Sequence, residues 1–387
     1  MIATRTAAPL RPEARRESGR DTSFAIRRAT SADNAQLIEL SAACSMAGDL
    51  TLRIDRGPDF FALNRLEDER WQVAVCEIGG RVVGCIAVSE RRSFVNGQEM
   101  QTGYVGDFKV HPRHRDTRIA DALSHYAERA CETLPATAPV MITVLAGNRA
   151  MERRLSGPRG VPAFRKIGTV RTHSIPILWQ RSAPAGGIRV DAARWSDLDE
   201  MVRLWSDVCS RRQLAPVVTA SGLSAWIRSA PGLDITSYKI ARSNSGEMLG
   251  FLAVWDQRSF KQLTVVGYSR RMKLARAAFN AVARAVDAER LPSAGSSLNC
   301  ATTAHICVTP DRPEVLRALV VSGYEDLRRA RCSVLNIGLD RRDPLTVGLD
   351  GLLSQPTDVN AYLLTTRRGV LPELVDGRTL HYEIALV

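Results

Sequence analysis

The run Gly103-Tyr-Val-Gly-Asp-Phe-Lys-Val-His-Pro-Arg-His-Arg-Asp-Thr-Arg-Ile-Ala-Asp-Ala-Leu123 joins a strand, a basic turn and a helix start. Pro112 ends the strand because proline has no backbone N–H to give to a β-ladder. Apolar residues at spacings of three and four then predict a helix with one buried face: Ile119, Leu123, Tyr126 and Ala127. The run therefore predicts a strand–turn–helix unit of a sheet covered by helices.

The turn between strand and helix is strongly basic, with Arg113, Arg115 and Arg118 inside six residues. The first backbone N–H groups of a helix have no partner within the helix, and the helix dipole is positive there. Guanidinium groups beside such amides favour anions, phosphates above all. The turn is therefore a candidate phosphate site.

This run resembles the signature of the GCN5-related N-acetyltransferases (GNAT). In that family a strand ending in hydrophobic-x-Val-x-Pro leads into Arg/Gln-x-x-Gly-x-Gly/Ala, a turn that holds the pyrophosphate of coenzyme A. Arg115 and Ala120 match the turn. Asp116 and Arg118 stand where the family has glycine, so side chains replace bare backbone near the phosphates.

The resemblance implies acetyl-CoA, or another acyl-CoA, as co-substrate, with no metal. The candidate cofactor-binding residues are Phe108, Lys109, Val110, Arg113, Arg115, Asp116, Thr117, Arg118, Ile119, Ala120 and Asn148. The signature strand is expected to splay from its neighbour, so that unpaired backbone of Phe108 and Val110 binds the pantetheine as an added strand. Asn148 is also expected to cap the helix that follows it.

In this family an amine attacks the thioester directly, and a backbone amide stabilises the oxygen that develops charge. Asp107, on the signature strand, is the candidate general base, acting directly or through water. The alternative is that Asp107 only fixes a loop or pairs with an arginine. Many relatives supply a tyrosine as general acid, but the matching position here is Leu155, and Tyr104 and Tyr126 do not match it.

The order of predicted elements gives an α/β fold with a mixed sheet and two tandem GNAT-like domains. We predict a disordered basic arm (1–23), a GNAT domain (24–180), a linker (181–187), a degenerate GNAT-like domain (188–340) and a C-terminal extension (341–387). The second copy is expected to place its signature pair at 263–269 and 270–286, where no glycine turn remains. The extension is expected to add edge strands at 362–366 and 382–387, and the halves to join through their sheets.

Composition limits the other classes of function. The net charge is +12, but aromatic residues are 6% and no repeated basic–aromatic pattern predicts a nucleic-acid groove. No apolar run reaches the ~20 residues of a membrane helix. The eight cysteines form no C-x-x-C pair, which favours reduced thiols and a cytoplasmic location. His111, His114 and His125 lack the spacing and carboxylates of a metal site.

The sequence thus predicts an acyl-CoA-dependent N-acyltransferase, with acetyl transfer to a primary amine of a small molecule or peptide. Two alternatives stay open. The chain could bind acyl-CoA as a non-catalytic sensor or scaffold, or it could be a basic nucleic-acid-binding protein. No membrane partner is expected, and the acceptor's identity and the oligomeric state are left open.

Overall fold

The computed structural model describes residues 23–46, 48–67, 70–115, 118–135, 137–155, 164–182, 186–364 and 375–387. The arm predicted for 1–23 lies outside these ranges except for Ser23. The elements of the first half are β1 (Ala25–Arg28), α1 (Asn34–Ala43), β2 (Leu50–Asp55), α2 (Ala62–Glu67), β3 (Arg70–Ile78), β4 (Arg81–Val95), β5 (Gln98–Val110), α3 (Ile119–Ala130), β6 (Val140–Leu145), α4 (Arg149–Leu155) and β7 (Phe164–Pro176). The predicted order of elements over 24–180 is confirmed, with β2 as an additional strand.

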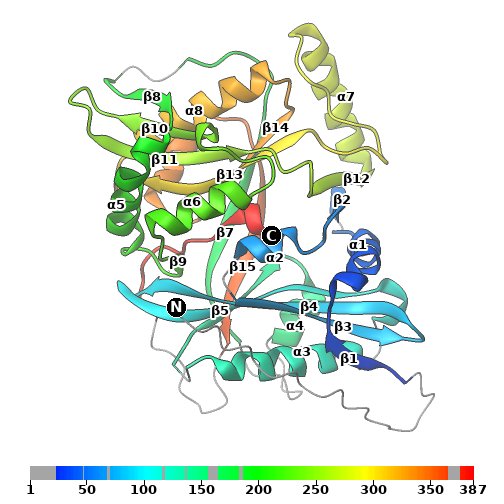
Figure 1. The fold of residues 1–387 in the computed structure, drawn as a ribbon. Helices are drawn as coiled ribbons and strands as arrows, with labels where there is room; N and C mark the ends of the chain where they lie inside the picture. Colours follow the sequence, from blue (N-terminus) through cyan, green and yellow to red (C-terminus); the bar gives the residue numbers. More distant parts are fainter. Residues whose placement is uncertain are drawn as a thin grey trace.

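The second half begins with a short strand and a helix, as the first does (Figure 1). Its elements are β8 (Arg189–Ala192), α5 (Leu198–Cys209), β9 (Ala215–Pro216), α6 (Ala220–Ser229), β10 (Tyr238–Arg242), β11 (Met248–Trp255), β12 (Gln262–Tyr268), α7 (Arg270–Ala285), β13 (Cys300–Val308), α8 (Pro313–Arg329), β14 (Val334–Asp340), β15 (Gln355–Leu364) and the terminal 3-10 turn η7 (Ile384–Leu386).

One mixed sheet of thirteen strands runs through both halves of the described chain. Its order is β1-β3-β4-β5-β6-β15-β7-β14-β13-β11-β10-β8, and β9 pairs with β4. The halves exchange strands at its centre: β7 pairs with β14 of the second half, while β15 pairs with β6 of the first. The prediction that the halves join through their sheets is therefore confirmed.

The predicted edge strands of the extension are wrong in position. β15 contains residues 362–364 of the first one, 362–366, whose last two residues lie outside the described ranges, but β15 lies inside the sheet, antiparallel to both β6 and β7. The second, 382–387, forms no strand and contains the turn η7 at Ile384–Leu386. The alternating apolar pattern predicts an extended segment, but it does not show whether that segment pairs with one neighbouring strand, with two, or with none.

Successive residues along the strands point to opposite faces of the sheet and so contribute to two separate core layers, one on each face. Val73 and Val75 of β3 face α1, whereas Ala74 and Cys76 face α3. In the second half Ile240 faces the α5–α6 side and Ala241 faces α8. Helices therefore cover both faces of the sheet in each half, and α3 lies below the first-half strands in Figure 1.

In the second half, the strand and helix that repeat the geometry of β5 and α3 are β13 and α8, whereas the sequence predicts the signature pair at 263–269 and 270–286. Asp107 in β5 and His305 in β13 both have positive φ, 47° and 50°, and the neighbouring strand shifts register beside each. The runs Asp107-Phe-Lys-Val-His-Pro112 and His305-Ile-Cys-Val-Thr-Pro310 then share Val and Pro. Only a short turn separates β13 from α8, so the arginine-rich turn has no counterpart there.

The predicted strand and helix at 263–286 exist as β12 and α7, within an insertion between β11 and β13. β12 pairs with β2 of the first half and lies outside the large sheet. α7 projects from the body (Figure 1), and Leu274 on it is 75% exposed. No helix in the described part of the chain is long and apolar enough to cross a membrane.

Candidate acyl-CoA site

The first half contains the predicted opening between two strands. β5 and β6 pair only over Gly103–Val105 and Val140–Ile142. At Asp107 the backbone bulges, and residues 106–110 have no partner on the β6 side in the described ladder. Residues 102–105 are buried and 106–110 partly exposed. This strand edge, which includes Phe108, Lys109 and Val110, is free of β6, and the carbonyl of Val110 accepts from Cys44 Sγ at 3.5 Å. It can accept an extended ligand as an added strand.

The arginine-rich turn lies at the outer end of this edge. Arg113, Arg115 and Arg118 are exposed, and helix α3 begins at Ile119. Asp116 and Thr117 lie outside the described residues. Ile119 is fully buried against the sheet, so only its backbone can reach a ligand, whereas Ala120 is partly exposed. Three exposed cations therefore lie in the segment that leads into the first amides of a twelve-residue helix, an arrangement that favours anions.

Close packing fixes the start of α3 on the sheet. A Cβ placed on Gly84 of β4 would lie 3.0 Å from Leu123 and 3.2 Å from Ile119. A side chain at this position would push α3 outward and move its first amides away from the strand edge. Gly84 thus positions the anion end of the site, a role that only the three-dimensional contacts reveal.

Asp107 is the centre of a buried ion-pair cluster. Its carboxylate accepts hydrogen bonds from Arg56 Nη1 at 3.2 Å and from Asn64 Nδ2 at 3.3 Å, and it pairs with Lys109. Burial alone would raise the pKa of Asp107, but the charges of Lys109 and Arg56 lower it well below the usual range. A carboxylate held in this way is a weak base. These contacts are those expected of the alternative role, pairing with an arginine.

Lys109 is predicted to bind the cofactor, but its ammonium is engaged with Asp107 and not with the arginine-rich turn. Its backbone remains on the free strand edge. Arg56 Nη2 also donates to the carbonyl of Phe60 at 2.6 Å, which ties the start of α2 to the bulge of β5. The cluster therefore holds together the strand edge and the helix beside it.

Asn148 caps α4, as predicted: its Oδ1 accepts from the backbone N–H of Met151 at 3.3 Å. The side chain is exposed. Leu155, where many relatives have a tyrosine, is 3% exposed and belongs to the core beneath the sheet. Tyr126 lies in the same core and donates to Gln72 at 3.2 Å.

A cluster of three hydroxyls lies where β5 and β6 separate. Tyr104 Oη is 2.9 Å from Thr143 Oγ1 and 3.3 Å from Tyr382 Oη, and Thr143 Oγ1 is 2.7 Å from Tyr382 Oη. Burial raises the pKa of Tyr104 well above its ordinary value and that of Tyr382 to about 12. Sequence reasoning missed this cluster because Tyr382 comes from the far end of the chain.

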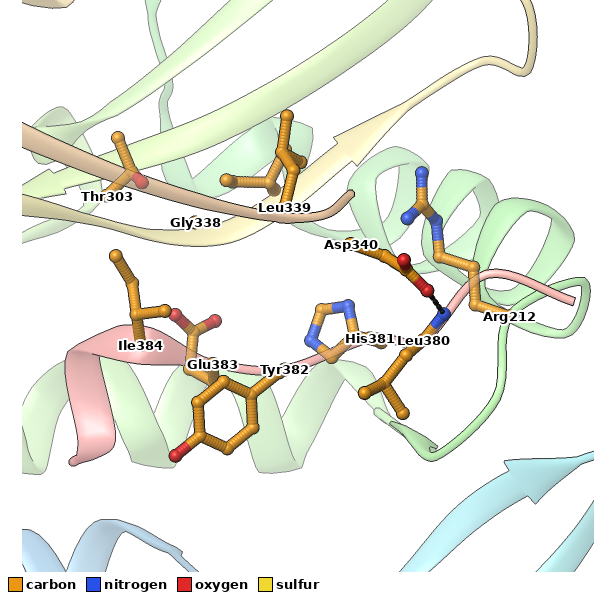
Figure 2. Close-up of a pocket in the computed structure, with 11 residues that line it drawn as sticks. Arg212, Thr303, Gly338, Leu339, Asp340, Leu380, His381, Tyr382, Glu383 and Ile384 are labelled. Carbon is orange, nitrogen blue, oxygen red and sulfur yellow. Dashed lines mark hydrogen bonds between the residues drawn. The ribbon is translucent and has the colours of Figure 1, made fainter. Parts of the chain in front are cut away.

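The equivalent opening of the second half is filled by the chain's own segment 380–384 (Figure 2). β13 and β14 pair only over Cys300–Thr302 and Val334–Asn336. Beyond them, the backbone N–H of His305 donates to Glu383 Oε2 at 2.7 Å, and Leu380 N donates to Asp340 at 2.8 Å. The cavity that remains has about 20 Å³, the size of one water molecule.

The terminal turn lies between the two halves (Figure 1). The carbonyl of Ala385 accepts from Gln257 Nε2 at 2.7 Å and from Lys261 Nζ at 3.1 Å. Burial, with the charge of Arg56, lowers the pKa of Lys261 to about 7, and burial raises that of Glu383 to about 7. These titratable groups were not predicted, because only the fold brings them towards the Asp107 cluster.

Within the described ranges, no three or more His, Cys, Asp or Glu side chains come together in a group that could hold a metal ion. His111 Nδ1 accepts from the backbone N–H of Arg113 at 3.3 Å. His125, on α3, pairs with Glu128. The histidines near the turn thus have local structural partners.

Comparison with known proteins agrees with this geometry. Residues 25–142 match the family model described as an acetyltransferase (GNAT) domain. No curated protein sequence matches the chain. Among solved structures, the N-myristoyltransferase of Saccharomyces cerevisiae with bound myristoyl-CoA is similar, with a TM-score of 0.61, 14% identity, and 94% of this chain and 90% of that chain covered.

A GCN5-related N-acetyltransferase from Sphaerobacter thermophilus has a TM-score of 0.56 at 16% identity, with 88% of this chain and 95% of that chain covered. One from Anabaena variabilis has a TM-score of 0.50 at 11% identity, covering 88% and 72% respectively. At such identities the structures show a common fold. Residues 25–142 are therefore similar in sequence to the acetyltransferase (GNAT) domain, and the fold shared with these structures extends over most of the chain.

Proposed function

We propose that the chain transfers an acetyl group from acetyl-CoA to a primary amine of a small molecule or peptide, by direct attack in a ternary complex. The observation that carries the proposal is the free edge of β5 at residues 106–110, which ends at the arginine-rich start of α3. A strand edge and an anion site joined end to end suit an extended ligand with a pyrophosphate. Acyl-CoA is such a ligand.

In this arrangement the pyrophosphate lies at Arg113, Arg115 and Arg118, with the first amides of α3. The pantetheine runs along residues 110 to 106, hydrogen-bonded to backbone as an added strand. The thioester then reaches the bulge at Asp107. The similar yeast structure holds myristoyl-CoA, which supports acyl-CoA as the donor class; the acetyl group is our proposal.

In the reaction, the neutral amine attacks the carbonyl carbon of the thioester. A nitrogen–carbon bond forms and the carbon–sulfur bond breaks, so that coenzyme A leaves as the thiolate. The proton lost by the amine passes through water to this thiolate, which becomes the free thiol. Backbone N–H groups at the bulge are suited to stabilise the transient oxyanion. We assign Asp107 a positioning role: paired with Arg56 and Lys109, it holds the bulge against α2.

The acceptor is proposed to enter from the face that carries α2, where the second half completes the cleft. Leu66 of α2 accepts a hydrogen bond from Trp226 of α6 at 2.8 Å, and η7 packs against both halves. A degenerate GNAT-like domain at 188–340 is supported by its matching bulge at His305. We further propose a cytoplasmic location, which the eight free cysteines support.

The test is release of free thiol from acetyl-CoA in the presence of a library of primary amines. Arg115→Glu should lower kcat/KM at least tenfold, because a charge-assisted hydrogen bond to phosphate is worth ~1.5–3 kcal/mol. Arg203→Glu, at an exposed position on α5, makes the same charge change away from the turn and should have no effect. Acyl-CoA binding without turnover for any amine would favour the sensor instead.

A further inference from the structure

One aromatic ring spans the opening between β5 and β6 at its closed end. Tyr104 belongs to the short paired stretch of β5, opposite Met141. A Cβ placed on Gly106 would lie 2.8 Å from Cε1 and 3.5 Å from Cζ of Tyr104, so the ring lies over Gly106. Its hydroxyl then reaches Thr143 of β6 at 2.9 Å. The side chain therefore bridges the two strands just where their ladder stops.

Gly106 is the residue that makes this placement of the ring possible. Any side chain there would collide with the ring and displace it from the sheet surface. Because residue 106 is a glycine, no side chain lies at the inner end of the opening, and the Tyr104 ring occupies that space. Tyr104 is only 8% exposed, so the ring is a packed part of the wall.

The ring is also held in place from the other end of the chain. Tyr382 Oη contacts both Thr143 at 2.7 Å and Tyr104 at 3.3 Å, and the two tyrosine ring centroids are 6.5 Å apart. Tyr382 is itself anchored by its neighbours, since Glu383 accepts from the backbone of His305 at 2.7 Å. Rotating Tyr104 away would leave partly buried hydroxyls without their partners, which is costly.

We propose that Tyr104, locked by Thr143 and Tyr382, is the specificity-determining residue that restricts the acyl group to a short chain. This inference rests on the proposed function, which lays the pantetheine along residues 110 to 106. An acyl group attached to that arm points further along β5, away from the arginine-rich turn. There it meets the Tyr104 ring, and each added methylene must either displace the ring or turn out of the opening.

The proposal is tested with a series of straight-chain acyl-CoAs from acetyl to octanoyl, measuring dissociation constants by calorimetry and kcat/KM with one acceptor. The wild type should bind acetyl-CoA and lose affinity as the chain lengthens. Tyr104→Ala should reverse the trend, because each newly buried methylene is worth about fourfold in affinity. The octanoyl-to-acetyl ratio should rise at least 100-fold relative to wild type.

Two further variants separate the ring from its hydroxyl. Tyr104→Phe removes the hydroxyl but keeps the ring packed over Gly106, and it should leave the preference for short chains within threefold of wild type. Tyr104→Leu keeps an apolar side chain and should relax the preference in the same direction as Tyr104→Ala, which preserves the test should the alanine variant not fold.

The contrary outcomes are distinct. A folded Tyr104→Ala or Tyr104→Leu variant that binds acetyl-CoA with an unchanged chain-length profile overturns the proposed role of Tyr104 in chain-length specificity and leaves the proposed function intact. A wild type that binds octanoyl-CoA as tightly as acetyl-CoA does the same. If the wild type binds no acyl-CoA of any length, both the proposed function and the proposed role of Tyr104 are wrong.

Discussion

Replacement of Asp107 by asparagine separates its two proposed roles. The variant keeps the shape of the side chain and an oxygen that can accept from Arg56 and Asn64, but it removes the negative charge. Arg56 is 4% exposed, so its guanidinium would remain buried with neutral partners only. Lys109, whose side chain is 19% exposed, would keep partial access to water.

The magnitude follows from this burial. Removing one partner of a buried ion pair costs ~3–5 kcal/mol, because the other charge stays desolvated. Partial hydration of Lys109 places the expected loss for Asp107→Asn near the lower end, about 3 kcal/mol. The double variant Arg56→Met/Asp107→Asn should lose less than the sum of the two single variants, since the Arg56 substitution removes the charge that Asp107→Asn leaves unpaired.

The pH dependence has a definite sign. The pKa of Asp107 is lowered in the fold, so its contribution to stability is present above the ordinary aspartate pKa of ~3.9 and is lost as the pH falls below it. The free energy of unfolding of wild type and Asp107→Asn, measured in urea, should therefore differ at pH 7. The difference should shrink as the pH falls below about 4.

Activity supplies the decisive comparison. As a positioning residue, Asp107 can be replaced with a modest loss of kcat and an unchanged shape of the pH–rate profile. A general base would instead give a loss of ~10²–10⁴-fold in kcat. Asp107→Asn with the wild-type free energy of unfolding and such a loss in kcat would refute the positioning role.

Two further predictions concern the second half. Gly338→Val should destabilise the fold by ~1–3 kcal/mol in urea unfolding, because even a Cβ would lie 2.4 Å from Ile384 Cγ2; wild-type stability would contradict the filled opening. Burial raises the pKa of Glu383 to about 7, so its stabilising contribution is full below pH ~4.3 and is lost as pH rises through 7. Wild type should thus lose about 2 kcal/mol relative to Glu383→Gln between pH ~5 and ~7.5, and parallel curves would count against a buried, neutral Glu383.

The first-half elements were predictable because their signals are local. Pro112 ends β5, the apolar spacing from Ile119 to Ala127 sets the buried face of α3, and Asn148 caps α4. The free edge after Val105 followed from the resemblance, and the ladder bears it out.

The positions of the strand and helix in the second half that correspond to β5 and α3 were predicted wrongly, because β13 and α8 are not joined by a basic turn. The Val308 and Pro310 pair repeats the end of the signature strand, but α8 starts at Pro313 without an arginine cluster. The insertion holding β12 and α7 offered a strand and a basic helix in the expected order. Its pairing with β2 depends on contacts across the two halves, which no local pattern encodes.

The roles of the C-terminal residues could not be predicted from the local sequence either, because they depend on contacts with distant parts of the chain. Alternation predicted a strand for 382–387, yet Glu383 and Ile384 are held in the opening between β13 and β14 by side-chain and backbone contacts. The partner of Asp107, Arg56, is likewise remote in sequence. Such pairings are set by topology, and only the assembled sheet makes them visible.

The most direct test of the central claim is calorimetric titration of the full chain with acetyl-CoA, alongside Arg115→Glu and Arg203→Glu. We predict one site per chain, because segment 380–384 fills the second opening. Binding should be lost or at least tenfold weaker in Arg115→Glu and unchanged in Arg203→Glu. Two equivalent sites, no binding at all, or binding that is indifferent to Arg115→Glu would contradict the assignment of the acyl-CoA site to β5 and α3.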